Sequence, residues 1–252
     1  MDSLKPRIIE GVGTPEASWQ HWLAGKGFPQ FAASQMLSEC QRMVIVAPHP
    51  DDEVLGAAGF IQLSARNSLP CTIVSVTDGE ASHPNSLLWT QEELRLKRIQ
   101  ESTRAQRFLA PKSQFLRLKI PDGKLVEHRS ELLAALETIL KPFDAVFCTW
   151  RYDGHPDHDV TGQICVELCQ KIGSKCFEIP IWAWHWASPS DPRIPWNRAV
   201  VLPLTSEQLA LKQQALACFQ SQLIPDPTTG KDAILPSWAV RRLMRPFELV
   251  FT

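Results

Sequence analysis

Short apolar segments alternate with longer amphipathic segments over most of the chain. Five segments read as buried strands because they are apolar or β-branched runs of strand length, at residues 43–47, 71–77, 115–118, 145–149 and 177–181. The longer segments between them read as helices, at residues 53–65, 90–109, 130–140 and 158–172. This alternation predicts an α/β fold, a Rossmann-like three-layer sandwich in which helices cover both faces of a mostly parallel sheet.

The two ends of the chain depart from this rhythm. Residues 1–41 read as a helical lead-in, with apolar anchors at Trp19, Trp22, Leu23 and Phe31. From residue 182 tryptophans and prolines become frequent, and they are followed by a strand at 200–202, a helix at 206–219 and a proline-rich loop at 225–236. We expect a single domain over residues 1–252, with an N-terminal extension at 1–41 and a C-terminal elaboration at 182–252. The tryptophans either wall a ligand cleft or pack against the edge of the sheet.

Composition narrows the class of protein. The chain has 252 residues, 44% of them hydrophobic, and a formal net charge of −1, which offers no electrostatic attraction for nucleic acid or an anionic membrane. No apolar run approaches the ~20 residues of a membrane-spanning helix. The N-terminus lacks the apolar segment of a secretory signal. We expect a cytoplasmic protein without a nucleic-acid partner or a membrane span.

Seven cysteines are scattered along the chain, mostly inside apolar stretches. Their odd number and their placement predict reduced, buried thiols and no disulfide framework. Cys165 and Cys169 lie one helical turn apart and could bind a metal. Because no second Cys or His pair lies nearby in sequence, packing is the favoured interpretation.

The first candidate for chemistry is the segment Pro48-His49-Pro50-Asp51-Asp52-Glu53, between a predicted buried strand and a predicted helix. Ligands of open parallel sheets bind beyond the carboxyl ends of the strands, where this segment should lie. Four ionisable groups in one turn repel one another unless a cation neutralises them. Taken alone, the acidic residues could instead cap the helix and compensate its dipole.

A second segment, Tyr152-Asp153-Gly154-His155-Pro156-Asp157-His158-Asp159, also follows a predicted strand and precedes a helix. His155 and His158 are three residues apart and could face the same side of a first helical turn. Alone, this segment could be a solvated turn. Together, at equivalent strand ends, the two segments predict one shared metal site.

The donors available suit zinc, which prefers histidine nitrogen with carboxylate oxygen and leaves a place for water at catalytic sites. We expect the ligands to be His49, Asp52 and His158, although another divalent ion is not excluded by the residue types. Asp51 and His155 would then remain uncoordinated beside the metal. A carboxylate there can act as general base, and a second imidazole can stabilise an oxyanion or donate a proton.

At these two segments the chain resembles the PIG-L deacetylase family, also called LmbE-like. The resemblance runs from about Met43 to the pair Ser221-Gln222 and includes weaker features, namely Thr77-Asp78-Gly79-Glu80, the pair Arg98 and Glu101, Pro121-Asp122-Gly123 and Lys212. It implies an LmbE-like fold and zinc-dependent N-deacetylation of amino sugars or similar amines.

The resemblance also implies roles for individual residues. His49, Asp52 and His158 would be metal ligands, Asp51 the general base and His155 an assisting residue, in agreement with the assignment from chemistry. Further residues would line the substrate side or orient a histidine, and these are Arg98, Asp122 and Asp157. Arg98 and Asp122 could instead be ordinary surface charges, and Asp157 could cap the helix that begins at His158.

The expected function is therefore hydrolysis of an N-acetyl or other N-acyl group on an amino sugar or N-acetylglucosamine-containing conjugate. Zinc-activated water would attack with Asp51 as base, and either Asp51 or His155 would protonate the leaving amine. One alternative is an amidase that cleaves a larger acyl group from a non-sugar or glycopeptide-like amine. Another is a non-catalytic sugar-binding or scaffold protein, which the presence of all site residues disfavours. The sequence leaves open the substrate, the acyl chain and whether the chain forms a homo-oligomer.

Overall fold

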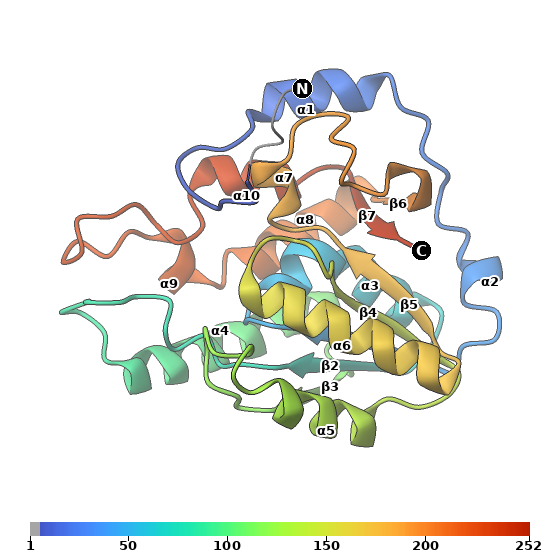
Figure 1. Cartoon of the computed structure of the whole chain (residues 1–252), viewed down its shortest axis with the longest axis horizontal. Coiled ribbons are helices and arrows are strands. Elements are labelled where there is room, and N and C mark those ends of the chain that lie inside the picture. Colours follow the sequence, from blue (N-terminus) through green and yellow to red (C-terminus); the bar gives the residue numbers. More distant parts are fainter. Residues whose placement is uncertain (1–5) are drawn as a thin grey trace.

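A computed structural model of the chain describes residues 6–252 (Figure 1). Within that range seven strands form one sheet in the order β3-β2-β1-β4-β5-β7-β6. The strands are β1 (Arg42–Ala47), β2 (Cys71–Ser75), β3 (Gln114–Arg117), β4 (Asp144–Thr149), β5 (Lys175–Ile179), β6 (Ala199–Pro203) and β7 (Phe247–Phe251). β1 to β5 pair in parallel, and β7 pairs antiparallel with both β5 and β6. The predicted α/β fold with a mostly parallel sheet is confirmed.

Helices cover both faces of this sheet because alternate strand residues point to opposite sides. On β1, Met43 and Ile45 join an apolar cluster with α3 (Asp52–Arg66), α4 (Gln91–Leu109) and α8 (Ser206–Leu216). Val44 and Val46 point the other way. Their cluster is completed by α5 (Arg129–Ile139) and α6 (Pro156–Ile172). The three predicted layers are therefore present.

Local chemistry explains where several helices begin and end. The Thr90 hydroxyl accepts the Glu93 backbone N–H while the Glu93 carboxylate accepts the Thr90 N–H, a capping box that begins α4. Proline stands at the first position of α6, directly after the N-cap residue His155. This helix therefore begins at Pro156, two residues before the predicted start.

Two predictions about the C-terminal part were wrong in detail. The predicted helix 206–219 ends at Leu216, and a separate helix α9 (Gln220–Leu223) follows, because the backbone leaves the helical conformation at the fully buried Phe219. The final strand β7 was not predicted. It lies between β5 and β6 in the sheet, so its partners are remote in sequence.

The N-terminal part is less helical than predicted. Within residues 6–41 the helices are α1 (Glu16–Ala24) and the single turn α2 (Ala33–Met36), while residues 1–5 of the predicted lead-in lie outside the described residues. The anchor Trp19 is buried among tryptophans of the C-terminal elaboration, which includes α7 (Ala183–Trp186), a 3-10 turn (Trp196–Arg198) and α10 (Ser237–Leu243). Most of these tryptophans thus serve packing.

Two further expectations concern membranes and thiols. No helix within residues 6–252 is long and apolar enough to cross a membrane. All seven cysteines are free thiols. Cys165 and Cys169 are buried in the apolar cluster between the sheet and α6, as the packing interpretation predicted.

Candidate active site

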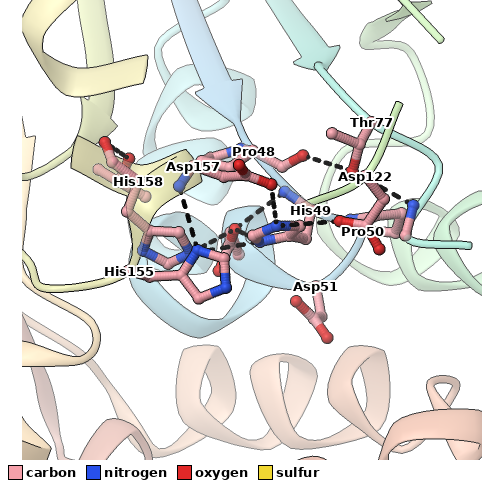
Figure 2. Close-up of polar contacts among 12 residues, drawn as sticks. Pro48, His49, Pro50, Asp51, Thr77, Asp122, His155, Asp157 and His158 are labelled. Carbon is pink, nitrogen blue, oxygen red and sulfur yellow. Dashed lines mark hydrogen bonds and ion pairs between the residues drawn. The ribbon is translucent and has the colours of Figure 1, made fainter. Parts of the chain in front are cut away.

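The two polar segments meet at one edge of the sheet, as predicted from their position after strands. β1 and β4 are neighbouring parallel strands, so the loops that follow them lie side by side. Figure 2 shows the side chains of His49, His155 and His158 gathered at this edge. The ring centroids of His49 lie 4.8 Å from those of His155 and 5.3 Å from those of His158.

Three side-chain atoms form a nearly equilateral triangle at the centre of the site. Asp52 Oδ2 lies 3.2 Å from His49 Nδ1 and 3.2 Å from His158 Nε2, and the two nitrogens are 3.3 Å apart. Zinc bound tetrahedrally at ~2.0–2.1 Å holds its ligands about 3.3 Å from one another. The chemistry and the spacing of these three donors therefore fit a small divalent metal ion.

The other nitrogen of each imidazole faces a carboxylate. His49 Nε2 lies 3.1 Å from Asp157 Oδ2 and 3.3 Å from Asp122 Oδ1. His158 Nδ1 lies 2.8 Å from Asp153 Oδ2. A ring N–H donated to these carboxylates leaves the lone pairs of His49 Nδ1 and His158 Nε2 directed at the triangle, an arrangement typical of metal-binding histidines.

Asp153 is a site residue that sequence reasoning did not single out. It is fully buried, and its carboxylate accepts the backbone N–H groups of Ile181, Trp182 and Ala183, each at 2.9 Å, besides facing His158. The residue was visible within the second segment. Its role depends on the chain passing back over it after β5, which no local pattern indicates.

Burial and charge shift the titration of these groups. Burial alone would lower the pKa of His49, but the carboxylates of Asp122, Asp157 and Asp52 raise it well above its usual value. Burial likewise opposes, and Asp52 and Asp153 outweigh it, so that the pKa of His158 rises to about 9. Against its burial, the pKa of Asp52 is held below its usual range by the two histidines. The carboxylates thus create a site that holds positive charge.

Asp51 is held beside the triangle by an arginine. It is buried, has a backbone φ of 122°, and its Oδ2 accepts from Arg98 Nη2 at 3.0 Å. Burial raises the pKa of Asp51 to about 7, although the Arg98 charge opposes this. A carboxyl group that titrates near neutrality can both take up and release a proton.

Arg98 lies in a tight mould. It is buried, and it also donates to the backbone oxygens of Pro50 and Gly79. Gly79 has a φ of +70°, and a Cβ there would lie 2.0 Å from Arg98 Nη1, so glycine is required at this position. The structure thus places Arg98 at the cleft but with its guanidinium engaged by Asp51 and the backbone.

His155 lies at the N-cap of α6 and borders the same space. Its Nδ1 accepts the backbone N–H of Asp157 at 3.2 Å, which leaves Nε2 as the protonated nitrogen of the neutral ring. Burial, together with the positive charge of His49 and His158, lowers the pKa of His155 to about 3. It is therefore a neutral hydrogen-bond donor at pH 7.

A cleft of about 260 Å³ opens over these groups. Its lining combines the ionisable residues with apolar and neutral polar side chains, namely His49, Asp51, Asp52, Leu55, Ala81, Ser82, Arg98, Asp122, Gly123, His155, Trp182, Gln222, Ile234 and Leu235. Trp182 is the member of the tryptophan-rich segment that lines the cleft. Both interpretations of that segment therefore apply, to different residues.

A buried hydrogen-bond network brings the late Ser-Gln pair to this cleft. Glu101 of α4 accepts the backbone N–H of Ser221 at 2.9 Å and its hydroxyl at 2.7 Å. Gln222 Nε2 donates to Ser221 Oγ at 2.9 Å. The two weak sequence features Arg98-x-x-Glu101 and Ser221-Gln222 are thus parts of one support for the cleft.

Two other groups within residues 6–252 bring possible ligand atoms within 4.8 Å of one another. One consists of His49, His155 and His158, and the other of His49, Asp122 and Asp157. His155 Nδ1 already accepts a backbone N–H. In the second group His49 would have to bind through the nitrogen that faces two carboxylates. The triangle with Asp52 uses the free lone pairs and fits better.

Comparisons with known proteins point to one family. The family model for PIG-L, described as GlcNAc-PI de-N-acetylase, matches residues 44–169. Among curated proteins, the chain is 32% identical over 139 residues to a Bacillus anthracis protein named "Probable N-acetyl-alpha-D-glucosaminyl L-malate deacetylase 2", covering 52% of this chain and 61% of that protein. It is 25% identical to the diacetylchitobiose deacetylase of Thermococcus kodakarensis, covering 57% of this chain and 54% of that one. Both matches span less than two thirds of the relative's length.

Among solved structures, the N,N'-diacetylchitobiose deacetylase from Pyrococcus horikoshii aligns with a TM-score of 0.57 and 22% identity. The alignment covers 88% of this chain and 85% of that one. The similarity in fold therefore extends well beyond the segment that the family model matches.

Proposed function

This chain belongs to the PIG-L family, and from that premise we propose that it is a metal-dependent hydrolase that removes an N-acetyl or other N-acyl group from an amino sugar. The named relatives support the reaction class, since both are deacetylases of N-acetylated sugar compounds. We further propose that residues 1–252 act as a single domain, because β6 and β7 extend the same sheet that carries the site.

The observation that carries the proposal is the triangle of His49 Nδ1, Asp52 Oδ2 and His158 Nε2, with edges of 3.2, 3.2 and 3.3 Å. We assign these three residues as the metal ligands and zinc as the ion that suits them. Asp157 and Asp153 would keep the two imidazoles in the binding tautomer. When bound, the ion would supply a Lewis acid that acidifies water and polarises the amide carbonyl.

Asp51 is the proposed general base. Its carboxylate takes the proton of the attacking water, and its pKa near 7 lets it return that proton to the departing amine. Arg98 keeps it in place. His155, neutral and with Nε2–H free, donates a hydrogen bond to the carbonyl oxygen as negative charge develops there. Asp51 is thus preferred over His155 for protonation of the amine.

The substrate side of the proposal rests on the remaining lining of the cleft. Asp122 Oδ2 accepts the Ala81 N–H at 2.9 Å and its Oδ1 faces His49, so it stands between the site and the substrate space. We keep Asp122 and Arg98 as residues that contact or border the sugar. The apolar side chains of Leu55, Trp182 and Leu235 favour a second candidate, an amidase that accepts a larger acyl group.

The test combines metal analysis of the purified protein with a fluorescamine screen for newly freed primary amines across N-acetylated sugars. The proposal expects about one divalent ion per chain and amine release that a chelator abolishes. Parallel assays with longer N-acyl groups separate deacetylase from amidase. Protein that holds no metal and releases no amine from any compound in the screen would refute the function.

A further inference from the structure

A buried lysine and glutamate from the C-terminal elaboration contact the helix that begins at the proposed metal ligand Asp52. Lys212 of α8 is fully buried, and Glu248 of β7 is 4% exposed. Their Nζ and Oε1 atoms are 2.8 Å apart. Lys212 Nζ also donates to the backbone oxygen of Leu55 at 2.8 Å.

Glu248 contacts the next turn of the same helix. Its Oε2 accepts the backbone N–H groups of Gly59 at 2.9 Å and Phe60 at 3.3 Å. In a regular helix the N–H of residue 59 is the partner of the carbonyl of residue 55. Lys212 and Glu248 therefore bind the acceptor and the donor of one helical hydrogen-bond pair in α3.

Gly59 makes this approach possible. A Cβ at this position would lie 2.9 Å from Glu248 Oε2 and 2.4 Å from Leu204 Cδ2. Any larger residue would push the strand side away from the helix. The close contact is therefore built into both partners.

The held peptide is directly connected to the catalytic segment. The Leu55 N–H donates to the Asp51 backbone oxygen at 2.8 Å, while the Leu55 oxygen accepts from Lys212. Leu55 also lines the cleft, together with Asp51 and Asp52. A shift of this first turn would move both carboxylates relative to His158, which comes from another element.

Stability is a poor reason to keep such a pair. Taking two charges out of water costs much of what their attraction returns, and apolar residues of similar size often do as well. We propose that Lys212 and Glu248 are positioning residues that fix the first turn of α3 so that Asp51 and Asp52 face His49 and His158. The inference rests on the proposed metal-dependent function.

The test replaces both charges, so that neither is left buried alone. The variant K212M/E248L keeps the apolar volume and loses every polar contact to α3. The variant K212M/E248Q keeps an amide oxygen for the Gly59 and Phe60 N–H groups. Each is measured by urea unfolding of the metal-free protein, by Zn²⁺ titration of the metal-free protein, and by kcat and KM for amine release.

We expect K212M/E248L to unfold at a similar urea concentration to the wild type but to bind Zn²⁺ roughly tenfold or more weakly, the size of effect typical of residues behind metal ligands. Its kcat falls with KM nearly unchanged, because the sugar contacts remain. K212M/E248Q should recover part of the Zn²⁺ affinity, since it restores the acceptor for the helix.

A matched control removes an enclosed ion pair that makes no hydrogen bond to α3. Arg245 and Glu16 are 2.7 Å apart with side chains 6% and 13% exposed. R245M/E16L should leave Zn²⁺ affinity unchanged. Wild-type affinity and kcat in K212M/E248L would overturn the inference, and so would failure of both Lys212 variants to fold. If the wild type binds no divalent metal, the proposed function itself fails.

Discussion

Each proposed ligand histidine presents one nitrogen to a buried carboxylate and the other to the shared centre. The sequence spacing indicated His49, Asp52 and His158 as a set, and the structure brings them together. It could not indicate which nitrogen faces inward, because this depends on carboxylates contributed by other loops. Asp153 is the clearest case, since its backbone partners lie near residue 182, remote along the chain.

Replacing Asp153 tests the orientation of His158. D153N leaves the side-chain volume but weakens the acceptor for His158 Nδ1–H, so we expect Zn²⁺ affinity to fall by roughly 10–100-fold. The measurement is Zn²⁺ titration of the metal-free protein. D159N is the matched control, since Asp159 bonds the Gly154 N–H and Arg7 but no proposed ligand. Equal affinities for the two variants would contradict the role of Asp153.

Replacing Asp51 separates catalysis from metal binding. D51N removes the proton acceptor, so we expect kcat to fall by roughly 10²–10⁴-fold, the usual contribution of a general base. Because Asp51 is not one of the proposed ligands, Zn²⁺ content should stay at the wild-type level. Amine release at the wild-type rate, or loss of the metal together with activity, would show that the assignment is wrong.

The histidines predict how pH acts on the metal-free protein. The pKa of His158 is raised to about 9 by Asp52 and Asp153 despite burial, and that of His49 is also raised. A group whose pKa is higher in the folded state stabilises the fold below its unfolded value of ~6.5 and loses this contribution as pH rises through the folded value. Urea unfolding of the metal-free protein should therefore show declining stability from pH 6.5 to 9.

The same protons must leave when a metal binds. Calorimetric Zn²⁺ titrations near pH 7.5, in buffers of different ionisation enthalpy, should thus show net proton release. Binding heats that do not depend on the buffer, or metal-free stability that rises over this pH range, would contradict the protonation states described here.

At the scale of elements, periodicity located the parallel core well. The central strands and the helices between them lie within about two residues of their predicted bounds at most ends. Local patterns failed where tertiary contacts decide. β7 has the composition of a strand but pairs between two partners distant in sequence. The break between α8 and α9 follows from the burial of Phe219, which no helical spacing reveals.

That break has a function that can be tested. It turns Ser221 toward Glu101, and thereby places Gln222 at the cleft. S221A leaves the Glu101 carboxylate with one fewer donor, and we expect a loss of about 1–3 kcal/mol in unfolding free energy. KM should rise while Zn²⁺ affinity stays, because α9 holds none of the proposed ligands. A KM equal to that of the wild type would show that α9 does not shape the substrate space.

The whole molecule combines a parallel core that carries the proposed ligands with antiparallel strands that complete the sheet. The family model matches only residues 44–169, yet Gln222 and Leu235 of the C-terminal elaboration line the cleft and Lys212 and Glu248 contact α3. The proposed site therefore depends on parts of the chain on both sides of residue 169. This dependence could not be predicted from motif spacing, because it arises from packing between remote segments.

The central claim is a single divalent ion held by two loops about a hundred residues apart. Crystals grown with Zn²⁺ and measured at the zinc absorption edge test it most directly. The account predicts one strong anomalous peak within ~2.0–2.2 Å of His49 Nδ1, Asp52 Oδ2 and His158 Nε2. A peak that lies against Asp122 and Asp157 without Asp52, or no peak near His49 at all, would contradict it.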